Sequence, residues 1–498
     1  MTLRAILAVD EGTTNSKAVL VGEDGVILAS AACPVATRHP RSGWVEQNAQ
    51  VIWDSTLNAV QTCIAQRPEV EILGLGISNQ RESILIWDRK TGLPLGPVIT
   101  WQCRRTAEAC DALKSAGHEP EVIARTGLPL DPMFPATKVR WLLDAHRDAG
   151  ATASDDICIG TVDAWLIWKF SGGTVHACDT SNAARTQLFN LAEMRWDPAL
   201  CELFDVPRGC LPAVHDSSHV FGTTLDVTGL PDGLPIAAAI GDSHGALFGH
   251  GAVRAGDGKI TFGTGSSVMT TISEFVPPPT GITTTIAWSL NGTPTYAFEG
   301  NILVSAAILP WTASLLGQPD VASLLDLAKT VESTEGVNLV PAHVGLGAPH
   351  WNSAARGVIS GLSFPSGPAH IARAAAESMA FQVQDVFAII EPNSPDGIGQ
   401  LFVDGGPSRD PFLMGLVADY LDHPVSTCET TESSAMGAAF LAGLAVGLWP
   451  EVASLDALRA KRGHLAPSLP AQTRAQHLVQ WAGAVTRATL EPQSQTNS

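Results

Sequence analysis

Short apolar runs that are typical of buried strands alternate along the chain with longer apolar runs that are typical of helices. In the first half we expect strands at 72–77 and 157–159 and helices at 137–145 and 162–169. In the second half we expect a strand at 401–403, followed by Asp-Gly-Gly, and a helix of small buried residues at 436–448. This alternation predicts an α/β protein in which helices pack on sheets.

Two short turns that contain glycine and threonine each stand between two apolar runs. The first is DEGTT at 10–14 and the second is FGTGS at 262–266, and both patterns predict β-hairpins. Backbone N–H groups and hydroxyls in such a turn can bind a phosphate without a lysine. About half of the chain separates Gly12 from Gly263, so the sequence predicts two related halves. Neither a G-x-x-x-x-G-K-[ST] nor a G-x-G-x-x-G segment occurs.

The composition bounds the size of the cores. The 498 residues are 45% hydrophobic, which is enough for two cores of about 250 residues each. The segment 248–258 is rich in glycine and poor in bulky residues, so we place a domain boundary there. We therefore expect one domain at 1–250, a second at 251–490 and a polar tail at 491–498.

The charge and the cysteines exclude several classes of partner. A net charge of −19 argues against nucleic acid or an anionic membrane. The nine cysteines are scattered without metal-ligand spacing, as reduced thiols of the cytosol are. An acid at position 10 comes too early for a signal peptide, and the apolar stretch 436–449 is too short to cross a bilayer. We expect a cytoplasmic protein without a nucleic-acid or membrane partner.

Ten segments form an ordered series over nearly the whole chain. They are DEGTTNSKAV at 10–19, GWVEQ at 43–47, ISNQRES at 77–83, TWQCRRTAE at 100–108, GTVDAWLIWK at 160–169, GDSHGALFG at 241–249, FGTGS at 262–266, GLGAPHW at 345–351, ARG at 355–357 and VDGG at 403–406. This series resembles the FGGY carbohydrate kinases, and within them the glycerol kinase branch. The resemblance implies two actin-like (RNase H-type) α/β domains with the active site in the cleft between them.

The resemblance also implies ATP-dependent phosphorylation of a terminal hydroxyl of a small polyol, with Mg²⁺. Asp242 matches the general base that accepts the proton of the attacking hydroxyl, although by itself it would fit a helix N-cap. Asp10 matches a residue that holds the metal through a water, and Asp242 also faces the metal. The first domain would carry the substrate and the first phosphate turn, and the second would bind the nucleotide. The positions matched to the nucleotide are Gly12, Thr13, Thr14, Lys17, Gly263, Thr264, Gly265, Gly405, Gly406 and Asp410.

Three further residues match those that bind the substrate in this family. Arg81 and Glu82 set a fork of donors beside an acceptor, which can bind two neighbouring hydroxyls. Trp101 matches an aromatic wall against the carbon side of the polyol. The resemblance therefore implies a site that recognises a polyhydroxylated molecule.

Three positions of the pocket depart from glycerol-specific relatives. Met133 stands where they carry Tyr, Ser243 where they carry Gln, and Ser267 where they carry Phe. Serine in place of two bulky groups should enlarge and hydrate the pocket, and Met adds an adaptable wall. We expect either a substrate longer than glycerol, such as a tetritol, or glycerol itself in a repacked pocket.

Two other classes of protein fit parts of the sequence. The segment 241–245 fits the G-x-S-x-G pattern of α/β hydrolases, with Ser243 as nucleophile and Asp404 and His464 as its partners. An actin-like or chaperone-like ATPase would use the two phosphate turns but not Arg81 or Trp101. The family resemblance further allows a homodimer or a homotetramer, by analogy alone.

Overall fold

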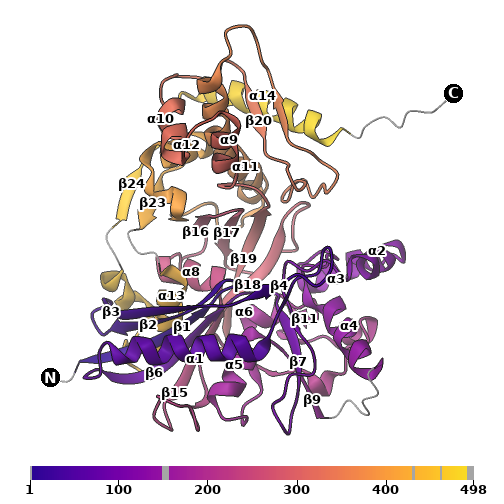
Figure 1. Ribbon diagram of the computed structural model, residues 1–498, viewed down its shortest axis with the longest axis vertical. Helices are drawn as coiled ribbons and strands as arrows, with labels where there is room; N and C mark the ends of the chain where they lie inside the picture. Colours follow the sequence, from indigo (N-terminus) through magenta and orange to yellow (C-terminus); the bar gives the residue numbers. More distant parts are fainter. Residues whose placement is uncertain (1–2, 149–155, 429–431, 460–461, 491–498) are drawn as a thin grey trace.

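The computed structural model describes residues 3–148, 156–428, 432–459 and 462–490. Figure 1 shows two lobes, with the first half of the chain in the lower lobe and most of the second half in the upper one. Each lobe contains one large mixed sheet. The predicted tail at 491–498 lies outside the described residues.

The sheet of the first lobe has the strand order β14-β15-β6-β1-β2-β3. Its strands are β1 (Arg4–Glu11), β2 (Asn15–Gly22), β3 (Ile27–Pro34), β6 (Glu71–Asn79), β14 (Ser218–Thr223) and β15 (Pro235–Gly241). β1, β2 and β3 form an antiparallel meander, whereas β6 runs parallel to β1 and β15 runs parallel to β6. Residues 5–9 and 18–21 are fully buried, as expected for strands that are covered on both faces.

The sheet of the second lobe repeats this order around β16. Its strands are β16 (Gly258–Phe262), β17 (Ser266–Ile272), β18 (Thr283–Leu290), β19 (Thr293–Ile302), β22 (Leu401–Gly405), β23 (Val425–Cys428) and β24 (Arg462–Leu465). The part β19-β17-β16 is antiparallel, and β22 and β23 continue it in parallel. This order matches β3-β2-β1-β6-β15 strand for strand. The predicted α/β fold of two related, actin-like halves is therefore confirmed.

The two lobes also contain smaller sheets. A five-stranded sheet of the first lobe contains β4 (Thr37–Arg38), β5 (Glu46–Gln47), β7 (Ile84–Asp88), β8 (Val98–Ile99) and β9 (Ile157–Thr161). The two-stranded sheets pair β10 (Ala177–Asp179) with β13 (Ala213–His215), β11 (Phe189–Asn190) with β12 (Arg195–Trp196), and β20 (Asn338–Val340) with β21 (Val358–Ser360). The predicted strands at 72–77, 157–159 and 401–403 lie in β6, β9 and β22.

The helices connect and cover these sheets. Those of the first half are α1 (Ala49–Ala65), α2 (Ala107–Ser115), α3 (Glu119–Thr126), α4 (Pro135–Asp148), α5 (Val162–Phe170), α6 (Thr180–Ala183), α7 (Pro198–Leu203) and α8 (Asp242–His250). Those of the second half are α9 (Ile308–Leu315), α10 (Val321–Ala328), α11 (Pro368–Asn393), α12 (Pro411–Leu421), α13 (Ser433–Ala445) and α14 (Ala471–Thr489). Within the described ranges, short 3₁₀ helices span Arg208–Cys210, Gly406–Arg409 and Val452–Leu458. No helix in the described ranges combines the length and the apolarity that a bilayer span needs.

The predicted helices differ in how well their ends agree with the structure. Those at 137–145 and 162–169 lie within α4 and α5. The helix predicted at 436–448 was wrong at both ends, because α13 begins at Ser433 and ends at Ala445. Gly447 adopts a left-handed φ of 73° just after α13, which ends a helix.

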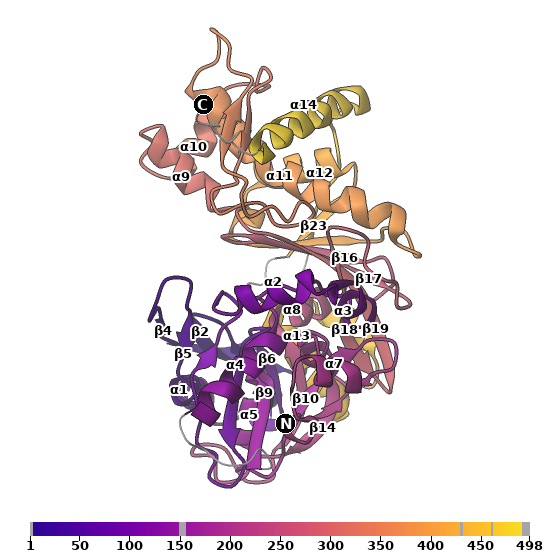
Figure 2. The ribbon, with the colours of Figure 1, turned by 90° about the vertical axis from the view of Figure 1, so that its right-hand side faces the viewer.

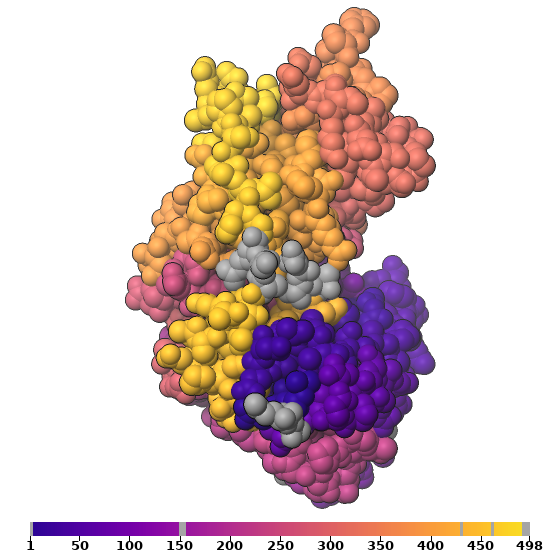
Figure 3. Space-filling view, turned by 90° about the vertical axis from the view of Figure 1, so that its left-hand side faces the viewer, coloured from indigo at the N-terminus to yellow at the C-terminus, as the bar shows by residue number. Residues whose placement is uncertain are grey.

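Helix α13 comes from the second half of the chain but packs in the first lobe (Figures 1 and 3). It lies on β6 and against α8. A Cβ on Gly437 would stand 1.9 Å from the carbonyl oxygen of Gly245, and one on Gly76 would stand 2.4 Å from that of Ala438. Only glycine permits these approaches. The tight contact fixes the start of α13 beside the start of α8.

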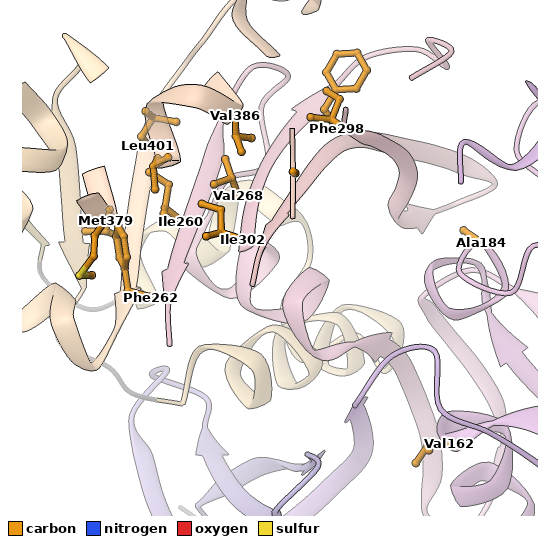
Figure 4. Packing of buried hydrophobic residues seen from close by; sticks show 14 of the residues in the cluster. Val162, Ala184, Ile260, Phe262, Val268, Phe298, Ile302, Met379, Val386 and Leu401 are labelled. Atoms are coloured by element: carbon orange, nitrogen blue, oxygen red, sulfur yellow. The ribbon is translucent and has the colours of Figure 1, made fainter. Parts of the chain in front are cut away.

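The core of the second lobe lies between its sheet and α11. Figure 2 shows α11 and α12 on the outer side of this sheet, and α8 and α13 on the side of the first lobe. Ile260, Val268 and Val386 gather there in Figure 4 and are fully buried. Burial of such apolar side chains is the main force that stabilises a fold. It holds β16 and β22, whose ends carry the predicted site residues, in one rigid layer.

Candidate active site

A cavity of about 850 Å³ opens between the two lobes, with walls from both. Eight of the predicted site residues line it, namely Asp10, Gly12, Arg81, Asp242, Ser243, Ser267, Gly405 and Gly406. They stand at or beside the ends of strands or at the start of α8. The structure thus brings residues from distant parts of the sequence to one cavity.

A backbone hydrogen bond closes each of the two Gly-Thr turns, although the second turn is one residue shorter than the first. The backbone N–H of Gly12 donates to the carbonyl of Asn15 over 3.0 Å, and that of Gly263 donates to the carbonyl of Gly265 over 2.8 Å. The paired strands are β1 with β2 and β16 with β17. Both predicted hairpins are therefore present, with Thr264 in the second turn.

Asp242 is the first residue of α8 and directly follows β15. Its Oδ1 lies 3.4 Å from Nε of Arg81 and accepts the backbone N–H of Ser243 over 2.6 Å. The side chain is 40% exposed to the cleft, yet burial raises the pKa of its carboxyl, an effect that Arg81 opposes. A carboxylate with a raised pKa is a better proton acceptor near neutral pH.

Two buried charged residues that sequence analysis missed lie beside Arg81. Glu299 Oε1 lies 2.8 Å from Nη2 of Arg81, and its Oε2 lies 2.8 Å from Nη1 of Arg185. Arg185 in turn donates from Nε to Oε1 of Glu82 over 2.6 Å. Burial opposes ionisation of Glu299, but the two guanidinium groups hold its pKa well below the usual range. This network fixes Arg81 toward Asp242 and pairs Glu82 with Arg185.

A sequence signal for this network did exist. Glu299 follows Tyr296-Ala-Phe298 within a strand of ten residues, and it is fully buried. A charge in such an apolar strand is rarely buried without a partner. Nothing in the local pattern indicates, however, that Arg185 is one of the partners.

A hydrogen bond joins Trp101 to the first Gly-Thr turn. Its Nε1 donates to Oγ1 of Thr13 over 3.0 Å, and 37% of the residue is exposed. The loop of Met133 is tied to the same region, because Nζ of Lys138 donates to the carbonyls of Met133 (2.6 Å) and Thr100 (2.9 Å). The indole and this loop therefore hold fixed positions relative to the first turn.

Other predicted residues have partners of their own. Lys17 forms an ion pair with Glu432 at 3.0 Å. Asp410 caps α12, since its Oδ1 accepts the backbone N–H groups of Phe412 and Leu413. Neither residue is among those that line the cavity, and the same holds for Glu82, Trp101, Met133, Thr13, Thr14 and 263–265.

Gly405 and Gly406 line the cavity where β22 ends. Gly405 has a φ of 91°, and a Cβ there would stand 2.0 Å from the carbonyl oxygen of Phe262. A side chain is therefore excluded at this position. Next to it, Asp404 Oδ2 lies 2.7 Å from Nε2 of His250. Burial opposes the ionisation of Asp404, but His250 and Lys259 lower its pKa to about 2.

The geometry does not support the hydrolase alternative. Ser243 Oγ accepts a hydrogen bond from Nζ of Lys259 over 2.9 Å. Asp404 is paired with His250, and His464 is hydrogen-bonded to a serine of β23. Among the described residues, Ser243, Asp404 and His464 therefore form no hydrogen-bonded chain.

Two carboxylates that face the cavity fit a magnesium ion. Burial raises the pKa of Asp10 to about 6, and although a hydrogen bond from Ser78 lowers it, the charge of Asp242 raises it further. Mg²⁺ is often held by one or two carboxylates together with substrate phosphates and water. Asp10 and Asp242 suit that mode, although the described part of the chain has no cluster of three or more His, Cys, Asp or Glu side chains that could hold a metal.

Glu11, another buried carboxyl beside the first turn, predicts a pH-dependent stability. Its carboxylate accepts from Nε2 of Gln80 over 3.1 Å, and burial raises its pKa from 4.5 to about 8. The native state therefore holds a proton that the unfolded state releases, so this group lowers stability as the pH rises through this window. We expect a loss of about 1.4 kcal/mol per pH unit.

Glu11→Gln should remove this loss. Urea unfolding at pH 5, 6.5 and 8 measures it, with exposed Glu69→Gln as the control. A slope for Glu11→Gln equal to that of the unsubstituted protein would contradict the prediction.

Comparisons with known proteins identify similar chains. The model for the FGGY family of carbohydrate kinases, N-terminal domain, matches residues 5–249, and that for the C-terminal domain matches 258–446. An apulose kinase of Pectobacterium atrosepticum is 44% identical over 492 residues, which cover 98% of this chain and 99% of the relative. A glycerol kinase of Bacillus mycoides is 41% identical over 486 residues, with coverages of 96% and 98%.

Solved structures show the same fold. Plasmodium falciparum glycerol kinase with ADP has a TM-score of 0.92 and 28% identity, and the match covers 98% of this chain and 99% of that one. A ligand-bound xylulose kinase from Lactobacillus acidophilus has a TM-score of 0.88 at 21% identity, and 97% of each chain is covered. The second likeness concerns the fold alone.

Proposed function

Because this chain belongs to the FGGY family of carbohydrate kinases, we propose that it transfers the γ-phosphoryl group of ATP to a terminal hydroxyl of a small polyol or sugar. One observation carries the proposal: Asp242 and Arg81 lie in the same cavity as Gly12 and Gly405. In this proposal Asp242 is the proton acceptor and the guanidinium of Arg81 binds the polyol. Gly12 and Gly405 are the two points in the same cleft where the backbone can approach a nucleotide closely. The family favours this activity over the hydrolase and ATPase alternatives.

In the proposed reaction, Asp242 accepts the proton of the attacking hydroxyl. The hydroxyl oxygen forms a bond to the γ-phosphorus, and the bond from that phosphorus to the bridging oxygen breaks and leaves its electron pair on ADP. Arg81 holds the carboxylate of Asp242 at 3.4 Å and donates to a substrate hydroxyl. Closure of the two lobes would exclude water, which otherwise competes for the phosphoryl group.

The nucleotide would bind across the cleft between the two halves. Backbone N–H groups of the turns at 10–14 and 263–265 hold the phosphates, and Gly405 and Gly406 leave room for the base. The solved glycerol kinase with ADP supports a nucleotide in such a fold. Mg²⁺, held by Asp10 through a water and by Asp242, would neutralise phosphate charge when bound.

We propose that the substrate is longer than glycerol. The hydroxyls of Ser243 and Ser267 lie 3.4 Å apart in the cavity, where glycerol-specific relatives carry Gln and Phe. Two small side chains beside Asp242 leave space for a further hydroxymethyl group. Curated relatives are named for apulose and for glycerol. The candidates for a longer substrate are therefore a tetritol and apulose, and glycerol is the alternative.

Substrate profiles of the unsubstituted protein and of Ser243→Gln/Ser267→Phe test the proposal. We expect kcat/KM for erythritol, threitol or apulose to exceed that for glycerol by at least about tenfold, since one more group in a fitted pocket has an effect of this size. The double variant should reverse the preference and keep its affinity for ADP. Glycerol as the best substrate of both proteins would contradict the longer substrate.

A further inference from the structure

Lys259 places a buried ammonium in the active-site cavity. It lies on β16, four residues before Gly263, and is 1% exposed. Its Nζ donates to Oγ1 of Thr261 over 2.6 Å and to Oγ of Ser243 over 2.9 Å. Both partners are neutral hydroxyls. Arg81 and Glu299 form an ion pair at 2.8 Å, whereas Lys259 has no such close carboxylate partner within the described ranges.

The other cations around the cavity are neutralised or solvated. Arg81 is paired with Glu299 and Asp242, and Lys17 is paired with Glu432. Arg409 is exposed, so water screens its charge. Lys259 therefore differs from these cations in being buried with hydroxyl partners alone.

An ammonium in this environment destabilises the fold. Burial lowers the pKa of Lys259, and the more distant charges of Asp404, Asp242 and Glu299 offset this only in part. Removing a charge from water without a directly bonded counterion costs free energy in a protein. A ligand that brings an anion would satisfy the group.

The position of Lys259 indicates which anion this is. Its Nζ contacts Ser243, the residue next to the proposed base, and its strand leads directly to the second phosphate turn. In the proposed reaction the acceptor hydroxyl binds at Asp242 and the phosphates bind at the second Gly-Thr turn. The ammonium contacts the residue after Asp242 and lies on the strand that leads to that turn. A polyol is neutral, so the anion brought to this point is the transferring phosphoryl group.

We infer that Lys259 is a catalytic residue that binds the γ-phosphoryl oxygens during transfer, an inference that rests on the proposed function. The bond between the substrate oxygen and the γ-phosphorus forms while the bond to the bridging oxygen breaks, with its electron pair passing to ADP and the hydroxyl proton to Asp242. Lys259 keeps its proton and stabilises the charge on the phosphoryl oxygens.

Binding of two nucleotides separates this role from a structural one. Calorimetry with ADP and with the β,γ-imido analogue of ATP, both with Mg²⁺, compares the unsubstituted protein with Lys259→Met and Lys259→Arg. We expect Lys259→Met to bind the analogue about 10- to 100-fold more weakly, the effect of one charge-assisted hydrogen bond, and to bind ADP as before. Lys259→Arg should retain most of the affinity for the analogue. Exposed Lys90→Met, 73% exposed at its side chain, is the control.

Each outcome decides between the two claims. Unchanged analogue binding by Lys259→Met, or equal losses for ADP and the analogue, overturns the role of Lys259 and leaves the kinase activity standing. An unsubstituted protein that binds neither nucleotide overturns both. If melting shows that Lys259→Met is unfolded, Lys259→Gln replaces it in the same comparison, with the same expected loss.

Discussion

Replacing Asp242 with asparagine is expected to lower kcat about 10³-fold while ADP binding stays unchanged. The amide has nearly the shape of the carboxylate but cannot accept the proton of the attacking hydroxyl, and such a proton acceptor contributes roughly 10²- to 10⁴-fold to the rate. Burial raises the pKa of this carboxyl, which strengthens it as a base. A coupled ADP-release assay with a saturating polyol or sugar measures the effect.

The control for this substitution is Asp24→Asn in the turn after β2. Asp24 is exposed and accepts a backbone N–H of that turn, so kcat should match that of the unsubstituted protein. If Asp242→Asn retained more than about a tenth of the rate, proton transfer to Asp242 could not limit the reaction, and the assignment of the base would be wrong.

Replacing Glu299 with alanine is expected to lower the free energy of unfolding by about 3–5 kcal/mol. The substitution leaves the guanidinium groups of Arg81 and Arg185 buried without their shared counterion. It also releases Arg81 from its fixed position beside Asp242, so the KM for the substrate should rise. Urea unfolding followed by tryptophan fluorescence measures the stability, and the ADP-release assay measures the KM.

Glu23→Ala is the matched control for this effect. It breaks an ion pair with Arg4 in which both side chains are about half exposed, and such surface pairs contribute about 0–1 kcal/mol. Glu299→Gln keeps the volume and removes only the charge, so its loss should fall between the two. A Glu299→Ala protein as stable as Glu23→Ala would show that the buried network does not hold the site together.

The parts of the fold that depend on neighbouring residues could be predicted from the sequence. The turns at 10–14 and 262–266 each stand between apolar runs, so both hairpins follow from local pattern. The spacing of the two turns predicts two related halves, and the two large sheets do have matching strand orders. Asp10, Gly12, Arg81, Asp242 and Gly405 meet in one cavity, as the ordered series of family segments implied.

The parts that depend on distant contacts could not be predicted. The sequence at 436–448 predicts a buried helix of small residues. Its packing in the first lobe depends on Gly76 and Gly245, which lie far earlier in the chain. The environment of Lys259 could not be predicted, because Thr261 and Ser243 become its hydrogen-bond partners only in the folded cavity. Asp410 illustrates the reverse, since its place before an apolar run suits the helix cap that it forms.

The most direct test of the account is whether ADP release requires an acceptor. The protein is incubated with Mg-ATP and, separately, with glycerol, erythritol, threitol, ribitol, xylitol, apulose or no acceptor, while ADP is quantified and the phosphorylated product is identified by mass spectrometry. We expect one phosphomonoester for each ADP with at least one acceptor, and formation of both products about 10³-fold more slowly with Asp242→Asn. ADP release at the same rate with and without every acceptor, with no phosphorylated product, would contradict it.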